Sequence, residues 1–416
     1  MKKIFILISI FILAFSLSSC NERSKNEKIE FDHSYFYGMC ETSGDLGGGV
    51  DPGITNEWIK NATSAIGGIK TFRLWISLGN LFNVDEENNL SFNVKYLNGV
   101  KDYVKAVTDA GCDHLLALVT SFIYPSDYST STGYVVPDPN EETEYYCEFL
   151  SLQARGAKML LDEVPEIKYF EPANEPELNS CIHKNGYVFG GSASVNSSFY
   201  YTDDERSGII LDMCYYIREA IREDHDDRYV LIPSLCNSES TIDFLDLIYR
   251  QIESRCFPSF TDYSVTDPDM YFDILNWHPY PTNTKGEIDD EWVDYQKRMY
   301  DVAINHSDNG KEVWFTEIGW TDWGNRSDQT RIANNYINMF DKTINELEFV
   351  TAVLMFRLTT LATQVASDNG SEENFGIFYN LDDPLYGGEA KEAAYAISKY
   401  INKENYDKSK LDNLKK

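Results

Sequence analysis

Basic residues are scarce in this sequence. Its 416 residues include 36 lysines and arginines against 67 aspartates and glutamates, and the formal net charge is −31. Proteins that bind the phosphate backbone of nucleic acids need a cationic surface, so the charge argues against a nucleic-acid-binding function. The same charge opposes adsorption to anionic lipid head groups.

Metal-binding sequence patterns are missing as well. The six histidines show neither a His-x-His nor a His-Glu-x-x-His spacing, and the eight cysteines form no Cys-x-x-Cys pair. We therefore expect no metal and no organic cofactor, and a metal-dependent hydrolase is the weaker alternative. Without Cys20, seven cysteines remain, so at least one should be unpaired even in an exported protein.

Only one long apolar run is present, from Ile4 to Leu17, and it is too short to favour a transmembrane helix. It follows two lysines and ends in Leu-Ser-Ser-Cys20, which resembles the lipobox of bacterial lipoproteins. The resemblance implies a signal peptide over 1–19 and a lipidated Cys20, followed by a flexible tether over 20–34. We expect export and lipid anchoring to a bacterial membrane, the outer one first, with the body on the periplasmic or cell-surface face. An ordinary secretory signal with an incidental cysteine is the alternative.

Eight short apolar segments alternate with eight amphipathic segments in the rest of the chain. The expected strands are 37–40, 71–77, 114–120, 169–172, 229–233, 274–278, 313–317 and 352–357. The expected helices are 55–66, 94–109, 145–164, 208–223, 242–252, 292–305, 330–347 and 390–401. This order predicts an α/β protein with a (β/α)8 barrel as a single catalytic domain over 35–404, followed by a charged tail over 405–416. A doubly wound sheet is the alternative, but no Gly-x-Gly-x-x-Gly follows an early strand.

Aromatic residues are plentiful, with 28 tyrosines, 23 phenylalanines and 7 tryptophans. Several of them fall in segment 177–203, among glycines and serines, after the fourth expected strand. Aromatic faces can stack on the C–H faces of sugar rings while polar neighbours bind the hydroxyl groups. The composition is thus compatible with a carbohydrate ligand.

Two glutamates end apolar strands at the edge where barrel enzymes build their active sites. Glu175 lies in Phe-Glu-Pro-Ala-Asn-Glu-Pro after the fourth strand, and Glu317 lies in Trp-Phe-Thr-Glu-Ile-Gly-Trp at the end of the seventh. A carboxylate in an apolar segment needs a partner, because burial of an unpaired charge is costly. Each could be structural, with Glu317 paired to Arg73 and Glu175 capping the next helix.

Together these two motifs resemble the retaining glycoside hydrolases of clan A, with features of families 5, 39 and 53. The resemblance covers about residues 35–402 and implies that Glu175 is the acid/base and Glu317 the nucleophile. It implies further that Arg73 supports the nucleophile and that Asn174 binds the sugar 2-hydroxyl. His278 and Tyr280 match the pair on the sixth strand, in which the tyrosine hydrogen-bonds the nucleophile.

Two departures leave the family within the clan open. The third strand ends in Val119-Thr120-Ser121, where family 5 members carry a histidine. The eighth ends in Met355-Phe356-Arg357, where many members carry a tryptophan beneath the sugar. Trp320 and Trp323 are the candidates to replace that tryptophan.

The resemblance implies double-displacement hydrolysis of β-linked glycosidic bonds. We expect an ionised Glu317 and a protonated Glu175 with a raised pKa. The long loops favour an endo-acting enzyme on a neutral polysaccharide, with β-glucan before mannan, xylan or galactan, although exo action stays open. We expect a monomer whose partner is the polysaccharide or oligosaccharide substrate, with membrane association only through the lipid. A non-catalytic, glycan-binding surface lipoprotein is the alternative.

Overall fold

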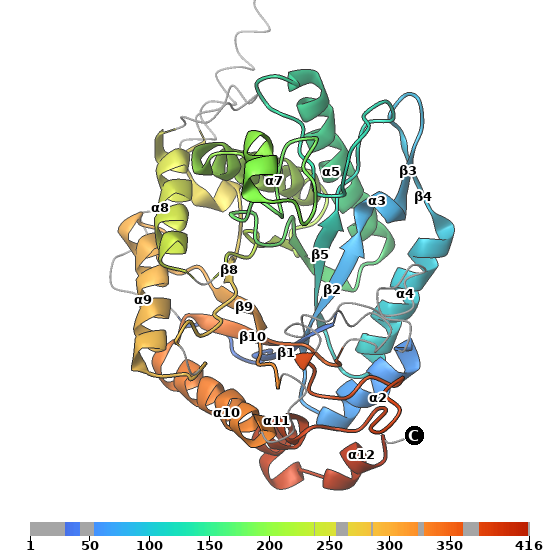
Figure 1. Ribbon diagram of the computed structural model, residues 1–416, viewed down its shortest axis with the longest axis vertical. Coiled ribbons are helices and arrows are strands. Elements are labelled where there is room, and N and C mark those ends of the chain that lie inside the picture. The colour runs from blue at the N-terminus through green and yellow to red at the C-terminus, as the bar shows by residue number, and fades with distance from the viewer. Residues whose placement is uncertain are drawn as a thin grey trace, which may run out of the picture. The chain divides into compact units, whose positions relative to one another are not determined.

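Eight parallel strands form the centre of the compact unit that begins at Asp32 (Figure 1). The computed structural model describes residues 30–41, 54–236, 238–254, 265–283, 286–322, 328–360 and 374–414. The strands are β1 (Tyr37–Glu41), β2 (Thr71–Ser77), β5 (His114–Ser121), β6 (Ile167–Glu171), β7 (Tyr229–Val230), β8 (Leu275–Trp277), β9 (Val313–Ile318) and β10 (Val350–Phe356). Each of them falls on one of the eight strands predicted from the sequence.

The sheet runs in the order β7-β6-β5-β2-β1-β10-β9-β8. Parallel bridges from Leu231 to Ile274 and from Leu235 to Trp277 connect its two ends. Neighbouring strands are therefore consecutive along the chain all the way round, apart from the short strands β3 and β4. The predicted (β/α)8 barrel is confirmed.

Helices follow the strands and cover the outside of the barrel (Figure 1). The main ones are α2 (Asn56–Ile66), α4 (Val94–Asp109), α5 (Thr143–Glu163), α7 (Asp203–Arg222), α8 (Glu239–Ser254), α9 (Asp290–Asn305), α10 (Gln329–Glu346) and α11 (Glu392–Asn402). Helix α7 begins five residues before the predicted start, because Thr202 and Glu205 form a capping box there. The apolar face indicates where a helix packs, whereas the cap decides where it begins.

Several short elements had no periodic signal. A small hairpin, β3 (Phe82–Val84) with β4 (Leu90–Phe92), follows the four-residue helix α3 (Leu78–Leu81). A three-residue strand is too short to show alternation. Within the segment predicted as a charged tail, Lys408–Asp412 forms α12, whose Leu411 is fully buried.

Aromatic and aliphatic side chains fill the barrel interior at the end where the strands begin. Tyr35 stacks on His114 with ring centroids 4.2 Å apart, and Tyr169 packs on Trp314 at 4.4 Å. Tyr35, Tyr169 and Trp314 belong to the buried core cluster, and His114 is partly exposed beside it. This packing closes one end of the barrel and leaves the carboxyl ends of the strands to carry chemistry.

Six cysteines are described, and all six are free thiols. Cys40, Cys112 and Cys214 are buried, as expected for small apolar side chains. Cys20 and Cys256 lie outside the described residues, and so does the predicted signal peptide. Among the described helices, none combines the length and apolarity that a membrane span requires.

A histidine at the end of α9 ties that helix to α8. His306 Nδ1 lies 2.8 Å from Glu253, and Nε2 lies 3.0 Å from Asp246. Burial lowers the pKa of His306, but the hydrogen bonds to the two carboxylates outweigh burial and raise it. The histidine therefore stabilises the fold fully below its unfolded pKa, and this contribution is lost as the pH rises through the folded value.

We expect His306→Gln to lower the melting temperature at pH 6 and to have less effect at pH 9. The difference should correspond to about 1 kcal/mol or less, because both carboxylates are half exposed. Thermal unfolding of the two proteins across this pH range measures it. An equal difference at both pH values would contradict a charged histidine in this pair.

Candidate active site

The two glutamates identified from the sequence converge on one histidine. His278 follows β8 and is fully buried; its Nδ1 lies 2.8 Å from Glu175 Oε1 and 3.8 Å from Glu317 Oε2. The distance between Glu175 Oε1 and Glu317 Oε2 therefore cannot exceed the sum of these two distances. Glycosidases that use two carboxyl groups hold them about 5–5.5 Å apart in the retaining class and about 6.5–9.5 Å apart in the inverting class. The upper limit here lies close to both ranges, so the two carboxyl groups can act on one glycosidic bond.

The backbone at Glu175 is unusual for a side-chain-bearing residue. Its φ is 44°, in the left-handed region that favours glycine. The Glu175 N–H donates to the carbonyl of Ser234 at 2.9 Å, which fastens the turn to the segment after β7. Residues held in such conformations cluster at functional sites, where the surrounding structure fixes them.

Glu317 is held by two donors from other parts of the barrel, one on β2 and one after β8. Arg73 on β2 donates from Nη1 to Glu317 Oε1, and Tyr280 donates to Oε2 over 3.4 Å. The Glu317 side chain is 8% exposed. Both partners were predicted from the sequence, and both favour the charged form of this carboxyl.

A third carboxylate, Glu171 at the end of β6, was missed by the sequence analysis. Arg73 donates to it from Nε and Nη2, both at 2.8 Å, and both side chains are fully buried. Asn276 donates to the same carboxylate at 2.9 Å, and Thr316 orients Asn276 at 2.7 Å. Glu171 thus holds the guanidinium in the orientation that reaches Glu317. The sequence signal was present, as a carboxylate inside an apolar strand.

The side chain of Asn174 is oriented by the same arginine. Arg73 Nη2 donates to Asn174 Oδ1 at 2.9 Å. Since the amide oxygen is occupied, the amide nitrogen is the group that can donate to a ligand. This orientation is the one that the predicted contact with a sugar hydroxyl requires.

Electrostatics at the site differ in one respect from the expectation. Burial raises the pKa of the Glu175 carboxyl, but the hydrogen bond and charge of His278 outweigh burial and lower it to about 2. Burial lowers the pKa of His278, but the charges of Glu317 and Glu175 raise it. For Glu317, burial outweighs the charges of His278 and Arg73, so that the pKa of this carboxyl is raised. These directions favour an ionised Glu175 beside a protonated His278, whereas the sequence analysis expected a raised pKa for Glu175.

Aromatic rings line the strand ends beside the carboxylates. Phe356, at the end of β10, stacks on Trp75 at 6.5 Å and packs on Phe375 at 5.7 Å. Phe375 in turn meets Tyr280 edge-on at 6.0 Å. The sequence analysis did not name the other three as site residues, since Trp75 and Phe356 lie in apolar strands, where an aromatic side chain is expected in the core, and Phe375 lies outside the predicted elements.

Trp320 is placed differently from the expectation. It is 5% exposed, donates to the carbonyl of Gly286 at 2.7 Å and packs on Tyr336 of α10 at 4.8 Å. The Trp320 ring therefore packs against α10, and Phe356, rather than a tryptophan, lies at the end of β10. Trp323 lies outside the described residues.

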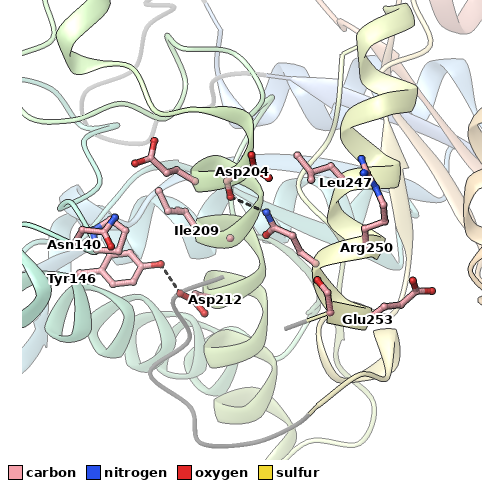
Figure 2. Close-up of a pocket in the computed structure, with 13 residues that line it drawn as sticks. Asn140, Tyr146, Asp204, Ile209, Asp212, Leu247, Arg250 and Glu253 are labelled. Atoms are coloured by element: carbon pink, nitrogen blue, oxygen red, sulfur yellow. Dashed lines mark hydrogen bonds between the residues drawn. The ribbon is translucent and has the colours of Figure 1, made fainter. Parts of the chain in front are cut away.

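A cavity of about 930 Å³ lies elsewhere, between α5, α7 and α8 (Figure 2). Figure 2 shows Tyr146 donating to Asp212, at 2.8 Å, inside it. Its lining includes none of the predicted site residues, so we assign it no part in the chemistry. Among the described residues, no group of three or more His, Cys, Asp or Glu side chains could hold a metal ion.

Replacing Glu171 tests the support of Arg73. We expect Glu171→Gln to destabilise the fold by about 3 kcal/mol, because it breaks a buried ion pair and leaves Arg73 without its main counter-charge. Urea unfolding measures the loss. The control is Glu163→Gln, which breaks the surface pair between Glu163 and Lys101, whose side chains are 43% and 41% exposed, and should change stability by less than about 1 kcal/mol. Equal effects of the two substitutions would argue against the support role.

Comparison with known proteins gives a structural answer but no sequence match. No family model and no curated protein matches the chain. Solved structures that are similar in fold include the following three. A β-glycosidase is 15% identical, with a TM-score of 0.57, and the match covers 90% of this chain and 97% of that one. A β-glucosidase from Thermotoga maritima is 14% identical, with a TM-score of 0.57 over 91% and 99% of the two chains. A family 39 glycoside hydrolase from Bacteroides cellulosilyticus is 13% identical, with a TM-score of 0.58 over 90% and 65%. The chain has the (β/α)8 barrel fold that these enzymes share.

Proposed function

We propose that this protein is a retaining β-glycoside hydrolase. The observation that carries the proposal is the convergence of Glu175 and Glu317, from the ends of β6 and β9, on the single side chain of His278. The fold it shares with the β-glucosidase and the family 39 enzyme supports the same conclusion. A purely structural role would not require two carboxylates at the catalytic end of the barrel.

Glu317 acts as the nucleophile in this proposal. Its oxygen attacks the anomeric carbon, the bond to the leaving oxygen breaks, and a glycosyl ester forms. Arg73 and Tyr280 keep Glu317 charged and oriented before the attack. The amide nitrogen of Asn174 donates to the sugar 2-hydroxyl, a contact that strengthens in the oxocarbenium-like transition state.

Glu175 acts as the acid/base, and His278 holds its proton. The Glu175 side chain is 21% exposed. A sugar ring that covers it removes water and favours the neutral form of a carboxyl group. The proton then moves from His278 Nδ1 to Glu175 Oε1, across 2.8 Å, and on to the leaving oxygen. After the ester forms, ionised Glu175 takes a proton from the attacking water.

For the substrate we propose a neutral β-linked polysaccharide cleaved internally, with β-glucan before mannan, xylan or galactan. The net charge of −31 disfavours polymers rich in uronic acids. The half-buried rings of Trp75, Phe356 and Phe375 offer apolar faces to a sugar. The matched β-glucosidase raises exo action as the competing possibility.

The test is product analysis on a panel of β-glucan, mannan, xylan and galactan. Proton NMR should show the β-anomer as the first product, because a retaining enzyme inverts the centre twice. A ladder of oligosaccharides at early times supports endo action, and monosaccharide alone supports exo action. If calorimetry shows that the protein binds a polysaccharide of the panel but cleaves none of them, a non-catalytic glycan-binding lipoprotein is the better description.

We also propose that the mature protein is anchored through a lipid on Cys20. The support is the sequence alone, in which Leu-Ser-Ser-Cys follows a short apolar run. Labelling with a radioactive fatty acid should mark the wild-type protein and not Cys20→Ala. Equal labelling of both would refute the anchor.

A further inference from the structure

A second glutamate lies beside the acid/base, and the mechanism above does not use it. Glu177 follows Glu175 with only Pro176 between them. The turn is tight, since the N–H of Leu178 donates to the carbonyl of Glu175 at 2.9 Å. Both glutamates are therefore fixed on one short turn at the end of β6.

The carboxyl group of Glu177 is buried and only half satisfied. Its Oε1 accepts a hydrogen bond from the backbone N–H of Cys236, in the segment after β7. Its Oε2 is buried and has no hydrogen-bond partner among the described residues. Burial of an unpaired carboxylate charge is costly, so this environment favours the protonated group. Burial outweighs the backbone hydrogen bonds from Cys236 and from Glu177 itself, which lower the pKa, and with the charge of Glu175 it raises the pKa of Glu177 to about 7.

The anchor made by Glu177 leads directly to the acid/base. The backbone of Cys236 is held by Glu177, and the thiol of Cys236 lies beside the Glu175 carboxyl, whose pKa it lowers. His278 contacts Glu175 at 2.8 Å. The Glu175 carboxyl therefore interacts with the side chains of His278 and Cys236, and Glu177 holds the backbone of Cys236.

Charged and titratable groups face Glu177 from three segments. They are Glu175 and Cys181 on its own loop, Cys236 after β7, and His278 after β8. His278 is the one group among them that can carry a positive charge, and it is already bonded to Glu175 and close to Glu317. Arg73, another cation of the site, is paired with Glu171 and Glu317. An ionised Glu177 would therefore stay uncompensated.

We propose that Glu177 is a positioning residue that holds the acid/base in place only while it is protonated, so that its ionisation ends activity on the alkaline side. When Glu177 ionises, the charge draws the carboxylate out of its buried position towards water. The bond to Cys236 is then lost, and Glu175 loses one of its two contacts. This inference rests on the proposed function, since it assigns the alkaline limit of the same active site.

The test compares Glu177→Gln and Glu177→Ala with the wild-type enzyme from pH 5 to pH 9. Glutamine keeps an oxygen for the Cys236 N–H and cannot ionise, whereas alanine removes the anchor. We expect Glu177→Ala to lower kcat at pH 5.5 roughly tenfold with little change in KM, because a misplaced acid/base slows the chemistry. Glu177→Gln should restore most of that loss and move the alkaline limb of the kcat/KM profile up by about one pH unit. A Glu177→Gln profile that superposes on the wild type, or that falls as low as Glu177→Ala, would overturn the proposal.

Thermal unfolding gives a readout that needs no activity. A carboxyl whose pKa is raised from 4.5 to about 7 on folding makes the wild type lose stability as the pH rises through that window. The melting temperature of Glu177→Gln minus that of the wild type should therefore be about 2 °C more positive at pH 8.5 than at pH 5. The same relative melting temperature at both pH values would overturn the protonated state assigned to Glu177. Absence of glycosidase activity in the wild type would refute the proposed function while leaving this thermal test valid.

Discussion

Replacement of Glu317 by alanine is expected to reduce turnover of an unactivated β-glycoside by roughly 10⁴-fold or more. The substitution removes the oxygen that forms the covalent intermediate. It also leaves Arg73 and Tyr280 without the carboxylate to which they donate. Because Arg73 keeps its paired contact with Glu171, the fold should survive, and the loss should fall on kcat.

Azide makes this prediction specific for the nucleophile. The anion fits the space left by the side chain, where Arg73 favours a negative charge, and attacks the anomeric carbon from the same side as Glu317. One inversion then gives an α-glycosyl azide, which NMR identifies. Glu317→Gln is the matched control, since its amide fills that space and should block rescue. Near-normal turnover of Glu317→Ala, or a β-azide product, would contradict the assignment.

The barrel could be predicted from the sequence because its strands carry a local signal. A parallel strand covered on both faces has a continuous apolar run, as in the Leu115–Val119 part of β5, and needs no distant information to be recognised. The hairpin made by Phe82–Val84 and Leu90–Phe92 lacks such a signal, because pairing between the two strands defines it more than composition does. The start of α7 depended on the Thr202 cap, which lies outside the apolar pattern.

The site residues likewise differ in whether the local sequence identifies them. Glu175 and Glu317 could be identified because each stands in a distinctive motif at a strand end. Glu171 lies in the same motif as Glu175, but its role could not be identified, since its partner Arg73 is 98 positions away and only the closed barrel brings them together. The lowered pKa of Glu175 could not be foreseen for the same reason: it depends on His278, which follows β8 and reaches Glu175 only in the closed barrel.

Replacement of Glu175 by alanine should have an effect that depends on the leaving group. The acid/base donates a proton to the departing oxygen, so an unactivated glycoside should lose roughly 10³-fold or more in kcat/KM. A dinitrophenyl glycoside leaves without a proton, and its kcat/KM should change by less than about tenfold. Kinetics across a series of aryl glycosides should therefore show a steep dependence on leaving-group pKa in the variant and a shallow one in the wild type.

Azide again separates the two glutamates. In Glu175→Ala the glycosyl ester on Glu317 still forms, and azide attacks it from the side on which Glu175 stood. The second inversion yields a β-glycosyl azide, opposite to the product expected from Glu317→Ala. His278→Asn is an informative companion, because it removes the proton donor that lies 2.8 Å from Glu175 while leaving the carboxyl in place. It should slow unactivated substrates more than dinitrophenyl glycosides and should yield no β-azide. If Glu175→Ala lost activity equally on every leaving group, Glu175 would have to act on the sugar itself, and the proton path from His278 would have no function in the first step.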